Sequence, residues 1–308
     1  MLQKSTLFQI PQFNHSAIQF SPFLPDIIGL SSGTNFNLIG NGRLHILRIG
    51  TQRQLQIVTV FDTQDTLFTL AFSECHENHL VTGGGDGSIR LWDISLKDHP
   101  VNIFKAHNRE VFSVNWNLIS KQTFISSSWD TTIKLWDPIH QNAMQTYLGH
   151  QGCVYEAKFS PRTDTEFSSC SSDGTVKIWD VRIPHPSHSF QVTPSEILSI
   201  DYDRYSGEII TGSTDKTLRY FDPRNLSKPR IETAIGGYAI RKVSCSPWRQ
   251  GEVMSSGYDM CVRLWQDGKQ VSQMDEHREF VMGCDWSLWK QGFVGSASWD
   301  ETIRIWEW

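Results

Sequence analysis

The chain of 308 residues carries a formal net charge of -5, so it has no overall cationic field to attract nucleic acid. No apolar run reaches the roughly 18 residues of a membrane-spanning helix, and residues 1–5 lack the apolar core of a secretory signal. The six cysteines show no Cys-x-x-Cys spacing, which predicts small buried hydrophobes in a reducing compartment, and therefore a cytosolic protein.

The first predicted element is a strand over residues 6–10, which has suitable β-forming character. A short motif with the sequence Asn-Gly-Arg-Leu-His-Ile-Leu follows at residues 41–47, and it combines a turn, a basic position and apolar alternation. This motif lies 45 residues before the first complete copy of a phrase that recurs through the rest of the chain. We interpret it as a degenerate copy of that phrase.

The repeated phrase consists of Asp, two residues, an aliphatic residue, Lys or Arg, a hydrophobic residue, and Trp or Phe. Its six copies begin at Asp86, Asp130, Asp173, Asp215, Asp259 and Asp300, in steps of 44, 43, 42, 44 and 41 residues. A period in the forties indicates one structural unit copied around the molecule. With the degenerate copy, seven units account for residues 1–308, and we therefore expect a single domain.

Each unit alternates apolar and polar residues with period two, as half-buried strands do. In one unit this pattern predicts strands over residues 111–116, 123–128 and 133–136, preceded by an outer strand near residues 102–104. Turn signals such as Asp86-Gly87 separate the strands. Four strands per unit, seven units and no helical periodicity predict an all-β fold, a seven-bladed β-propeller. The last unit stops after three strands, so we expect the strand at residues 6–10 to complete it and close the ring.

The repeated phrase resembles that of WD-repeat proteins, and His107, His150 and His277 each precede the signature Asp of their unit by 23 residues. In that family such a His, a strand Ser or Thr, the Asp and the Trp form a buried hydrogen-bonded set. The resemblance therefore implies a structural role for His107, Asp130, Trp136, His150, Asp173, Trp179, His277, Asp300 and Trp306. Two units depart from the pattern, with Val192 beside Thr193-Pro194 in one and Gly237 in the other at the His position.

Three stretches are weak candidates for chemistry. Residues 75–79 and 185–188 contain metal-ligating side chains, but both stretches fall in predicted loops, which we interpret as ordinary solvated loops. Residues 82–87 are rich in Gly, but they lead from a strand into a β-turn, whereas a phosphate cradle requires a helix N-terminus or nest. We therefore predict no metal site, no cofactor and no catalytic residue.

Positions that differ between the units are expected at the rim of the ring, where they carry specificity. One variable set directly precedes the signature Asp residues: Gly85, Trp129, Ser172, Thr214, Tyr258 and Trp299. A second set opens the innermost strands: Asp65, Phe68, Glu110, Phe112, Tyr155, Glu156, Glu196, Leu198, Arg241 and Met282. From these sets we predict a peptide-binding mouth of Asp65, Phe68, Glu110, Phe112, Trp129, Tyr155, Glu196, Arg241, Tyr258 and Trp299. Carboxylates among aromatics suit a peptide with a basic residue and an apolar stripe, and the alternatives are local packing and rim solubility.

Six longer stretches carry a more specific signal: residues 20–23 (Phe-Ser-Pro-Phe), 107–116, 127–130, 238–243 (beginning Tyr-Ala-Ile-Arg), 285–289 and 298–303 (beginning Ser-Trp-Asp-Glu-Thr). They resemble the family of receptors for the type 2 peroxisomal targeting signal, the seventh peroxin. The match spans all seven units. The Tyr-Ala-Ile-Arg and Ser-Trp-Asp-Glu-Thr phrases are much more specific than a bare WD repeat.

The resemblance implies a cytoplasmic import receptor that shuttles to the peroxisome and works with a co-receptor and docking peroxins. Its cargo would carry an N-terminal nonapeptide of the form Arg/Lys, Leu/Val/Ile, five residues, His/Gln, Leu/Ala, which is amphipathic as a helix. We hypothesise that Asp65, Glu110 and Glu196 meet the basic residue. The apolar face would then contact Phe112, Trp129, Tyr258 and Trp299. A closed ring favours a monomer.

Other classes of function stay open, because a propeller fold does not define function. One alternative is a general scaffold, such as a ligase substrate adaptor or a G-protein β-like subunit, and a histone- or peptide-binding adaptor is the nearest rival. The expected lack of an N-terminal helix and of a second domain disfavours the scaffolds. An enzyme with a site in the mouth has the least support, since no nucleophile, base and orienting acid stand out as a group.

Overall fold

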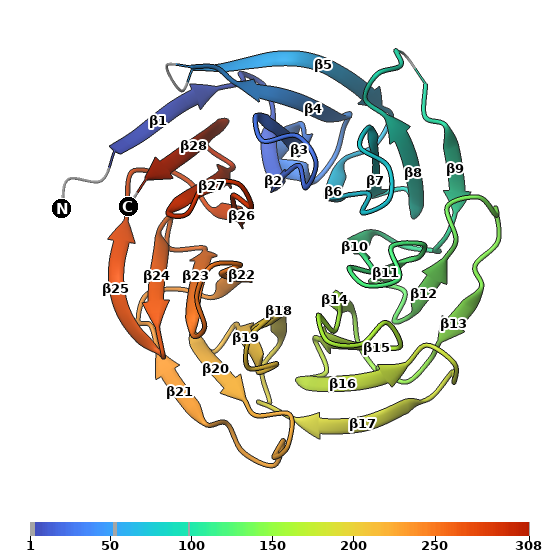
Figure 1. Cartoon of the computed structure of the whole chain (residues 1–308), viewed down its shortest axis with the longest axis vertical. Helices are drawn as coiled ribbons and strands as arrows, with labels where there is room; N and C mark the ends of the chain where they lie inside the picture. The colour runs from blue at the N-terminus through green and yellow to red at the C-terminus, as the bar shows by residue number, and fades with distance from the viewer. Residues whose placement is uncertain (1–3, 52–53, 98, 308) are drawn as a thin grey trace.

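The computed structural model describes residues 4–51, 54–97 and 99–307, which form a ring of seven four-stranded antiparallel sheets (Figure 1). The predicted seven-bladed β-propeller is therefore confirmed. In blades 1 to 6 the strands follow one another from the central channel outward (Figure 1). Among the described residues, the helical structure is a single 3₁₀ turn, η1 (Asn35–Asn37).

The first four blades follow the chain in order. Blade 1 comprises β2 (Asn14–Phe20), β3 (Ile27–Gly33), β4 (Gly42–Ile49) and β5 (Leu55–Thr63). Blade 2 comprises β6 (Leu67–Phe72), β7 (His79–Gly84), β8 (Ser88–Asp93) and β9 (Asn102–Lys105). Blade 3 comprises β10 (Val111–Trp116), β11 (Phe124–Ser128), β12 (Ile133–Trp136) and β13 (Gln145–Tyr147). Blade 4 comprises β14 (Val154–Phe159), β15 (Glu166–Ser171), β16 (Thr175–Asp180) and β17 (Pro186–Gln191).

Blades 5 and 6 also follow the chain in order. Blade 5 comprises β18 (Ile197–Tyr202), β19 (Ile209–Ser213), β20 (Thr217–Phe221) and β21 (Ile231–Ala234), and blade 6 comprises β22 (Ile240–Cys245), β23 (Glu252–Gly257), β24 (Val262–Gln266) and β25 (Lys269–Met274).

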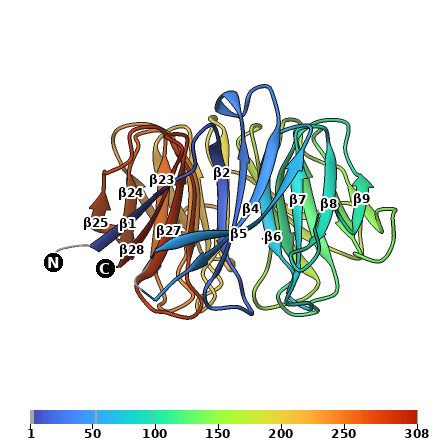
Figure 2. The same cartoon turned by 90° about the horizontal axis from the view of Figure 1, so that it is seen from above.

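The last blade joins the two ends of the described chain. Blade 7 comprises β26 (Val281–Trp286), β27 (Phe293–Ser298), β28 (Thr302–Glu307) and β1 (Lys4–Gln9). β1 pairs antiparallel with β28, from Lys4 opposite Glu307 to Gln9 opposite Thr302 (Figures 1 and 2). The predicted ring closure is thus confirmed. The closing strand begins two residues before the predicted start at residue 6 and ends one residue before the predicted end at residue 10.

The signature turns share one backbone conformation, and this explains their sequences. The residue after each signature Asp has a left-handed φ of 65° to 77°, at Gly87, Thr131, Gly174, Lys216, Met260 and Glu301. Glycine adopts this conformation without steric cost. At Gly87 the space is also closed, because a Cβ would lie 2.4 Å from the carbonyl oxygen of His107. In all six turns, with glycine or without it, Oδ1 of the signature Asp accepts the backbone N–H of the residue two positions later. Asp130 Oδ1, for example, accepts the backbone N–H of Thr132 at 3.0 Å.

In blades 3, 4 and 7 the signature residues form a connected hydrogen-bonded set. In blade 3, Nδ1 of His107 lies 2.9 Å from Asp130, and Nε2 of His107 lies 2.8 Å from Ser126 Oγ. Ser126 Oγ also accepts the indole N–H of Trp136 at 2.9 Å. The ionised Asp130 carboxylate only accepts, so Nδ1 of His107 carries a proton and donates it to Asp130. In the neutral imidazole Nε2 then accepts the hydroxyl proton of Ser126. Equivalent contacts join His150, Asp173, Ser169 and Trp179, and His277, Asp300, Ser296 and Trp306.

Blades 2, 5 and 6 lack this His, and an Arg four residues after the signature Asp pairs with it instead. The pairs are Arg90–Asp86, Arg219–Asp215 and Arg263–Asp259. In blade 5, Thr193 takes the position of the His and donates its hydroxyl to Asp215 at 2.7 Å. Burial opposes ionisation of Asp215, but the hydrogen bonds from Arg219, Ser213 and Thr193 lower the pKa of this carboxyl to about 2. The signature Asp is therefore held by a His in blades 3, 4 and 7 and by an Arg in blades 2, 5 and 6.

The Ser126 hydroxyl is expected to contribute to stability, because both His107 and Trp136 depend on it. Replacing Ser126 by Ala leaves buried donors and acceptors unpaired, which costs roughly 1–3 kcal/mol in the free energy of unfolding. Ser127→Ala is the matched control, since the buried Ser127 hydroxyl has no hydrogen-bond partner among the described residues. Urea denaturation of both variants measures the effect. Equal stability of the two would contradict a role for the hydrogen-bonded set.

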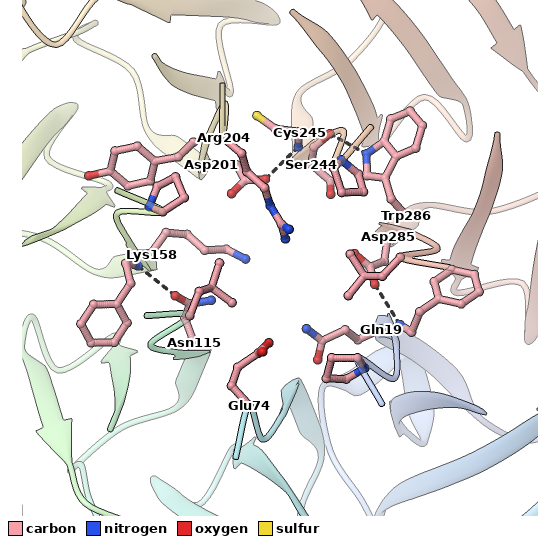
Figure 3. A pocket seen from close by; sticks show the side chains of 18 residues that line it. Gln19, Glu74, Asn115, Lys158, Asp201, Arg204, Ser244, Cys245, Asp285 and Trp286 are labelled. Atoms are coloured by element: carbon pink, nitrogen blue, oxygen red, sulfur yellow. Dashed lines mark hydrogen bonds between the residues drawn. The ribbon is translucent and has the colours of Figure 1, made fainter. Parts of the chain in front are cut away.

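At the carboxyl ends of the described inner strands, polar side chains accept backbone hydrogen bonds from the neighbouring blade at four of the seven interfaces (Figure 3). Backbone N–H groups donate across the blade interface as follows: Phe72 to Gln19 at 2.8 Å, Phe159 to Asn115 at 2.9 Å, Cys245 to Asp201 at 2.8 Å, and Phe20 to Asp285 at 2.8 Å. Burial raises the pKa of Asp285 to about 6. These side chains line a cavity of about 100 Å³, and their contacts give them a role in holding the blades together.

Candidate functional site

The opposite end of the channel opens into a larger cavity of about 450 Å³. It forms where the inner strands begin and where the signature turns meet them. All ten residues predicted for the peptide-binding mouth line this one cavity: Asp65, Phe68, Glu110, Phe112, Trp129, Tyr155, Glu196, Arg241, Tyr258 and Trp299. Gly85, Thr214, Leu198 and Met282 from the two variable sets line it as well. We call this cavity the mouth.

A first aromatic row, formed by Phe68, Phe112, Trp129 and Tyr155, covers blades 2, 3 and 4. The rings of Phe68 and Phe112 are stacked with centroids 4.7 Å apart, and Phe112 stacks on Trp129 at 4.6 Å. Tyr155 meets Phe112 edge-on at 5.8 Å. The guanidinium of Arg241 lies 5.5 Å from the Phe112 centroid, within the range of a cation–π contact. The row is therefore a rigid apolar surface rather than a set of separate side chains.

A second aromatic row, formed by Tyr258, Phe280, Trp299 and Phe36, runs along blades 6, 7 and 1. Tyr258 meets Phe280 with centroids 4.9 Å apart, Phe280 meets Trp299 at 5.5 Å, and Trp299 meets Phe36 at 6.0 Å. Tyr258, Trp299 and Phe36 line the mouth, and Phe280 connects the first two. The mouth thus has aromatic surfaces on both sides of the ring.

The three predicted carboxylates occupy different surroundings. Asp65 accepts the backbone N–H of Thr66 at 2.7 Å, and partial burial, with Asp86 and Glu110 nearby, raises the pKa of its carboxyl. Gly85 faces it, and a Cβ there would lie 2.9 Å from an Asp65 carboxylate oxygen. A half-buried acid with a raised pKa beside another acid gains stability when a cation arrives, because the cation favours its charged form. Asp65 and Glu110 therefore make a suitable cation site.

Glu196 lies farther around the ring, in front of blade 5. Its carboxylate accepts the phenolic O–H of Tyr155 at 2.9 Å. Burial and the neighbouring Glu196 carboxylate raise the pKa of Tyr155, so the phenol stays protonated and continues to donate. Glu196 is thus fixed at the end of the first aromatic row. The hypothesis that all three acids meet one basic residue becomes more specific, since Glu110 lies near Asp65 and beside the exposed Arg109, whereas Glu196 is hydrogen-bonded to Tyr155.

Comparison with known proteins identifies the family. Residues 55–93, 98–137, 141–180 and 268–307 match the family model described as "WD domain, G-beta repeat". The protein named peroxisomal targeting signal 2 receptor in Saccharomyces cerevisiae is 34% identical, over 91% of this chain and 93% of its own length. Proteins of the same name are 37% identical in Mus musculus, over 91% and 89%, and 37% identical in Homo sapiens, over 90% and 87%. The chain belongs to the peroxisomal targeting signal 2 receptor family. The resemblance inferred from sequence motifs is confirmed.

In this receptor-family member, two residues of the variable sets expected at the rim, neither of them among the ten predicted mouth residues, do not line the mouth. Glu156 does not line the mouth but faces the channel, where it pairs with Lys242 and accepts the hydroxyl of Ser199 at 2.6 Å. Its side chain follows Tyr155 on a strand whose pairing is irregular between residues 154 and 156, so the alternation of faces shifts at this point. Ser172, the blade 4 member of the first variable set, is likewise not among the residues that line the mouth.

The sequence did not predict two elements at the mouth of this receptor-family member, namely Phe280 and the segment Phe36–Leu38. Phe280 directly precedes β26, and an aromatic residue beside the inner strand could have been found by aligning the blades there. The segment at residues 36–38 has no counterpart in other blades, so alignment of the repeats gives no signal for it.

The remaining sequence candidates show no metal site. Within residues 4–51, 54–97 and 99–307, no group of three His, Cys, Asp or Glu side chains is placed to hold a metal ion. In the stretch at residues 75–79, the rings of His76 and His79 stack at 3.8 Å. The same described ranges contain no helix long and apolar enough to cross a membrane.

Proposed function

We propose that this chain is an import receptor that binds the N-terminal type 2 targeting signal of peroxisomal matrix proteins in the mouth. The observation that carries the proposal is the combination of an acidic pair, Asp65 and Glu110, with two aromatic rows in one cavity. The relatives from yeast, mouse and human, by their names, are receptors of this signal. Their similarity extends over about nine tenths of this chain, which includes the mouth.

The chemistry of the mouth fits an amphipathic helix with a basic residue near one end. The basic side chain reaches the Asp65–Glu110 pair, where a charge-assisted hydrogen bond forms in a partly desolvated site. The apolar face of the helix rests on the aromatic rings, which give up water on contact. Nothing in this mode of binding needs catalysis, and the ten mouth residues act as a binding surface.

Further parts of the proposal concern the cell rather than the mouth. A nonapeptide loses much conformational freedom when it becomes ordered, which supports a co-receptor that holds the signal from the solvent side. We include in the proposal docking peroxins as partners, a cytoplasmic protein that shuttles to the peroxisome, a single propeller domain over residues 1–308, and a monomeric state. The paired edge of β28 supports the monomer, since the β1 strand covers it.

Fluorescence anisotropy of a labelled type 2 signal peptide, titrated with the purified protein, tests the proposed function. The control peptide carries Ala at the basic and His positions, and a histone-tail peptide without the apolar stripe represents the rival adaptor function. We expect selective binding of the signal that becomes stronger when cell extract supplies a co-receptor. Equal binding of the signal and control peptides with and without extract would contradict the proposal, and preference for the histone peptide would favour the adaptor.

A further inference from the structure

The connection between β3 and β4 differs from its counterparts in every other blade. It comprises residues 34–41, whereas the equivalent connection in blade 2 comprises residues 85–87 and that in blade 7 comprises residues 299–301. The extra length forms η1 and projects above the other connections at one end of the channel (Figure 2). We call residues 34–41 the blade 1 loop.

The blade 1 loop is held in a strained conformation. Asn35, Phe36 and Asn37 have left-handed φ angles of 50°, 55° and 60°. Asn adopts this conformation more readily than other non-glycine residues, but for Phe36 it is unfavourable, so specific contacts must hold the loop. Strain of this kind is common where a structure presents a side chain for binding.

The contacts that hold the loop come from buried polar side chains of β2. Asn14 accepts the backbone N–H of Phe36 at 2.6 Å and donates its amide to the carbonyl oxygen of Trp299 at 2.6 Å. Asn37 donates its amide to Ser16 Oγ at 2.7 Å. Asn14 thus ties the loop to the signature turn of blade 7, and it fixes the place of Phe36 beside Trp299.

The other side of the loop is packed against the segment that carries Asp65. Gly42, which follows the loop, leaves so little space that a Cβ there would lie 2.3 Å from the Asp65 carbonyl oxygen. A Cβ at Gly33, which precedes the loop, would lie 2.4 Å from Asn37 Oδ1 and 2.5 Å from Thr66 Oγ1. The blade 1 loop therefore bridges the second aromatic row and the acidic pair.

The blade 1 loop presents apolar side chains to the mouth, between the second aromatic row and the acidic pair. Phe36 is 50% exposed and Leu38 is 79% exposed, and both line the mouth. Ile39 is equally exposed, at 77%, but it does not line the mouth. Exposed apolar side chains next to a cavity mark a binding surface, because they gain burial when a ligand arrives.

We propose that the blade 1 loop is a specificity element of the mouth, in which Phe36 and Leu38 enclose the apolar residue that neighbours the cation bound at Asp65. This inference rests on the proposed function and adds the residues that determine which apolar side chain is bound next to the basic residue of the signal. A cation at Asp65 places the adjoining residue of the ligand near the loop, since Gly33 and Gly42, which flank the loop, lie against the segment of Asp65 and Thr66. A large aliphatic side chain packs against the exposed faces of Phe36 and Leu38, and Ala leaves these two side chains in contact with water.

The test compares two signal peptides, one with Leu and one with Ala after the basic residue, by anisotropy. The intact protein is expected to prefer Leu by about 10-fold or more, since each buried methylene contributes about 0.8 kcal/mol. In the double variant Phe36→Ala/Leu38→Ala, the preference should fall to within about 3-fold, with the affinity for the Ala peptide nearly unchanged. Ile39→Ala is the control and should keep the full preference, and the Leu38→Ala single variant gives an intermediate value.

The outcomes separate the inference from the proposed function. If the intact protein binds neither peptide, with or without extract, the proposed function fails. If it prefers Leu and the double variant keeps that preference while its thermal unfolding midpoint is unchanged, the specificity role of the loop is overturned. Loss of preference in the Ile39→Ala control would also overturn it, because the effect would then not come from the residues that line the mouth.

Discussion

Deletion of residues 1–10 is expected to lower the free energy of unfolding by roughly 3–5 kcal/mol, since it removes the buried parts of Phe8 and Ile10 at about 1.5–3 kcal/mol each. These two side chains pack in one core cluster with Phe293, Ile303 and Ile305 of blade 7. The deletion also breaks the pairing of β1 with β28 and makes β28, with backbone groups that β1 had paired, the edge strand of blade 7. An open edge pairs readily with other chains, so the shortened protein should also associate in a concentration-dependent manner.

Urea denaturation and sedimentation of the shortened protein measure both effects. Deletion of residues 1–3 is the control, because it leaves β1 (Lys4–Gln9) intact and should preserve stability. The account of ring closure would be contradicted by a chain without residues 1–10 that unfolds at the same urea concentration as the intact protein and stays monomeric.

Reversal of charge at Glu110 is expected to weaken binding of the signal peptide by about 100-fold, because it removes an attraction and adds a repulsion in a partly desolvated site. Glu110→Lys should leave the thermal unfolding midpoint nearly unchanged. The Glu110 side chain contacts Arg109 at 3.6 Å, and the backbone carbonyl that accepts the Trp129 N–H is retained in the variant. Anisotropy and thermal unfolding, measured on the same preparation, separate binding from folding.

Glu77→Lys supplies the control for Glu110→Lys, because it makes the same change of charge on an exposed side chain in the loop between β6 and β7. That loop joins the end of an inner strand to the next strand, so it lies away from the mouth. We expect Glu77→Lys to bind the peptide as the intact protein does. Equal weakening by both variants would indicate a general electrostatic effect, and a lowered unfolding midpoint in Glu110→Lys would indicate a folding role.

The period of the signature explains why so much of the fold was predictable. Each Asp at a step of 41 to 44 residues marks the same turn, so the strands around residues 102–136 could be placed within one or two residues. The predicted mouth residues also followed from the repeat. Positions equivalent by sequence lie at equivalent places around a ring, and this symmetry brings Asp65 and Trp299 to one cavity although 234 positions separate them.

Features that break the repeat could not be predicted in the same way. The blade 1 loop has no equivalent, and its direction depends on left-handed residues held by Asn14, a contact between distant parts of the chain. Glu156 faces the channel because of an irregularity in strand pairing, which recurs at the start of the inner strand in all seven blades but carries no signal in the residue types. The pairing of Arg219 with Asp215 was missed, although its spacing of four residues recurs in blades 2 and 6.

A reciprocal exchange of charge tests the central claim most directly, namely that the acidic pair binds the basic residue of the signal. Anisotropy is measured for the intact protein and for Glu110→Lys, each with the natural signal peptide and with a peptide carrying Glu at the basic position. The account predicts that Glu110→Lys binds the Glu peptide at least about 10-fold more tightly than the natural peptide, as expected for complementary close charges. If Glu110→Lys binds the Glu peptide no better than the natural one, while the intact protein still binds the natural peptide, the basic residue is bound elsewhere and the claim is contradicted.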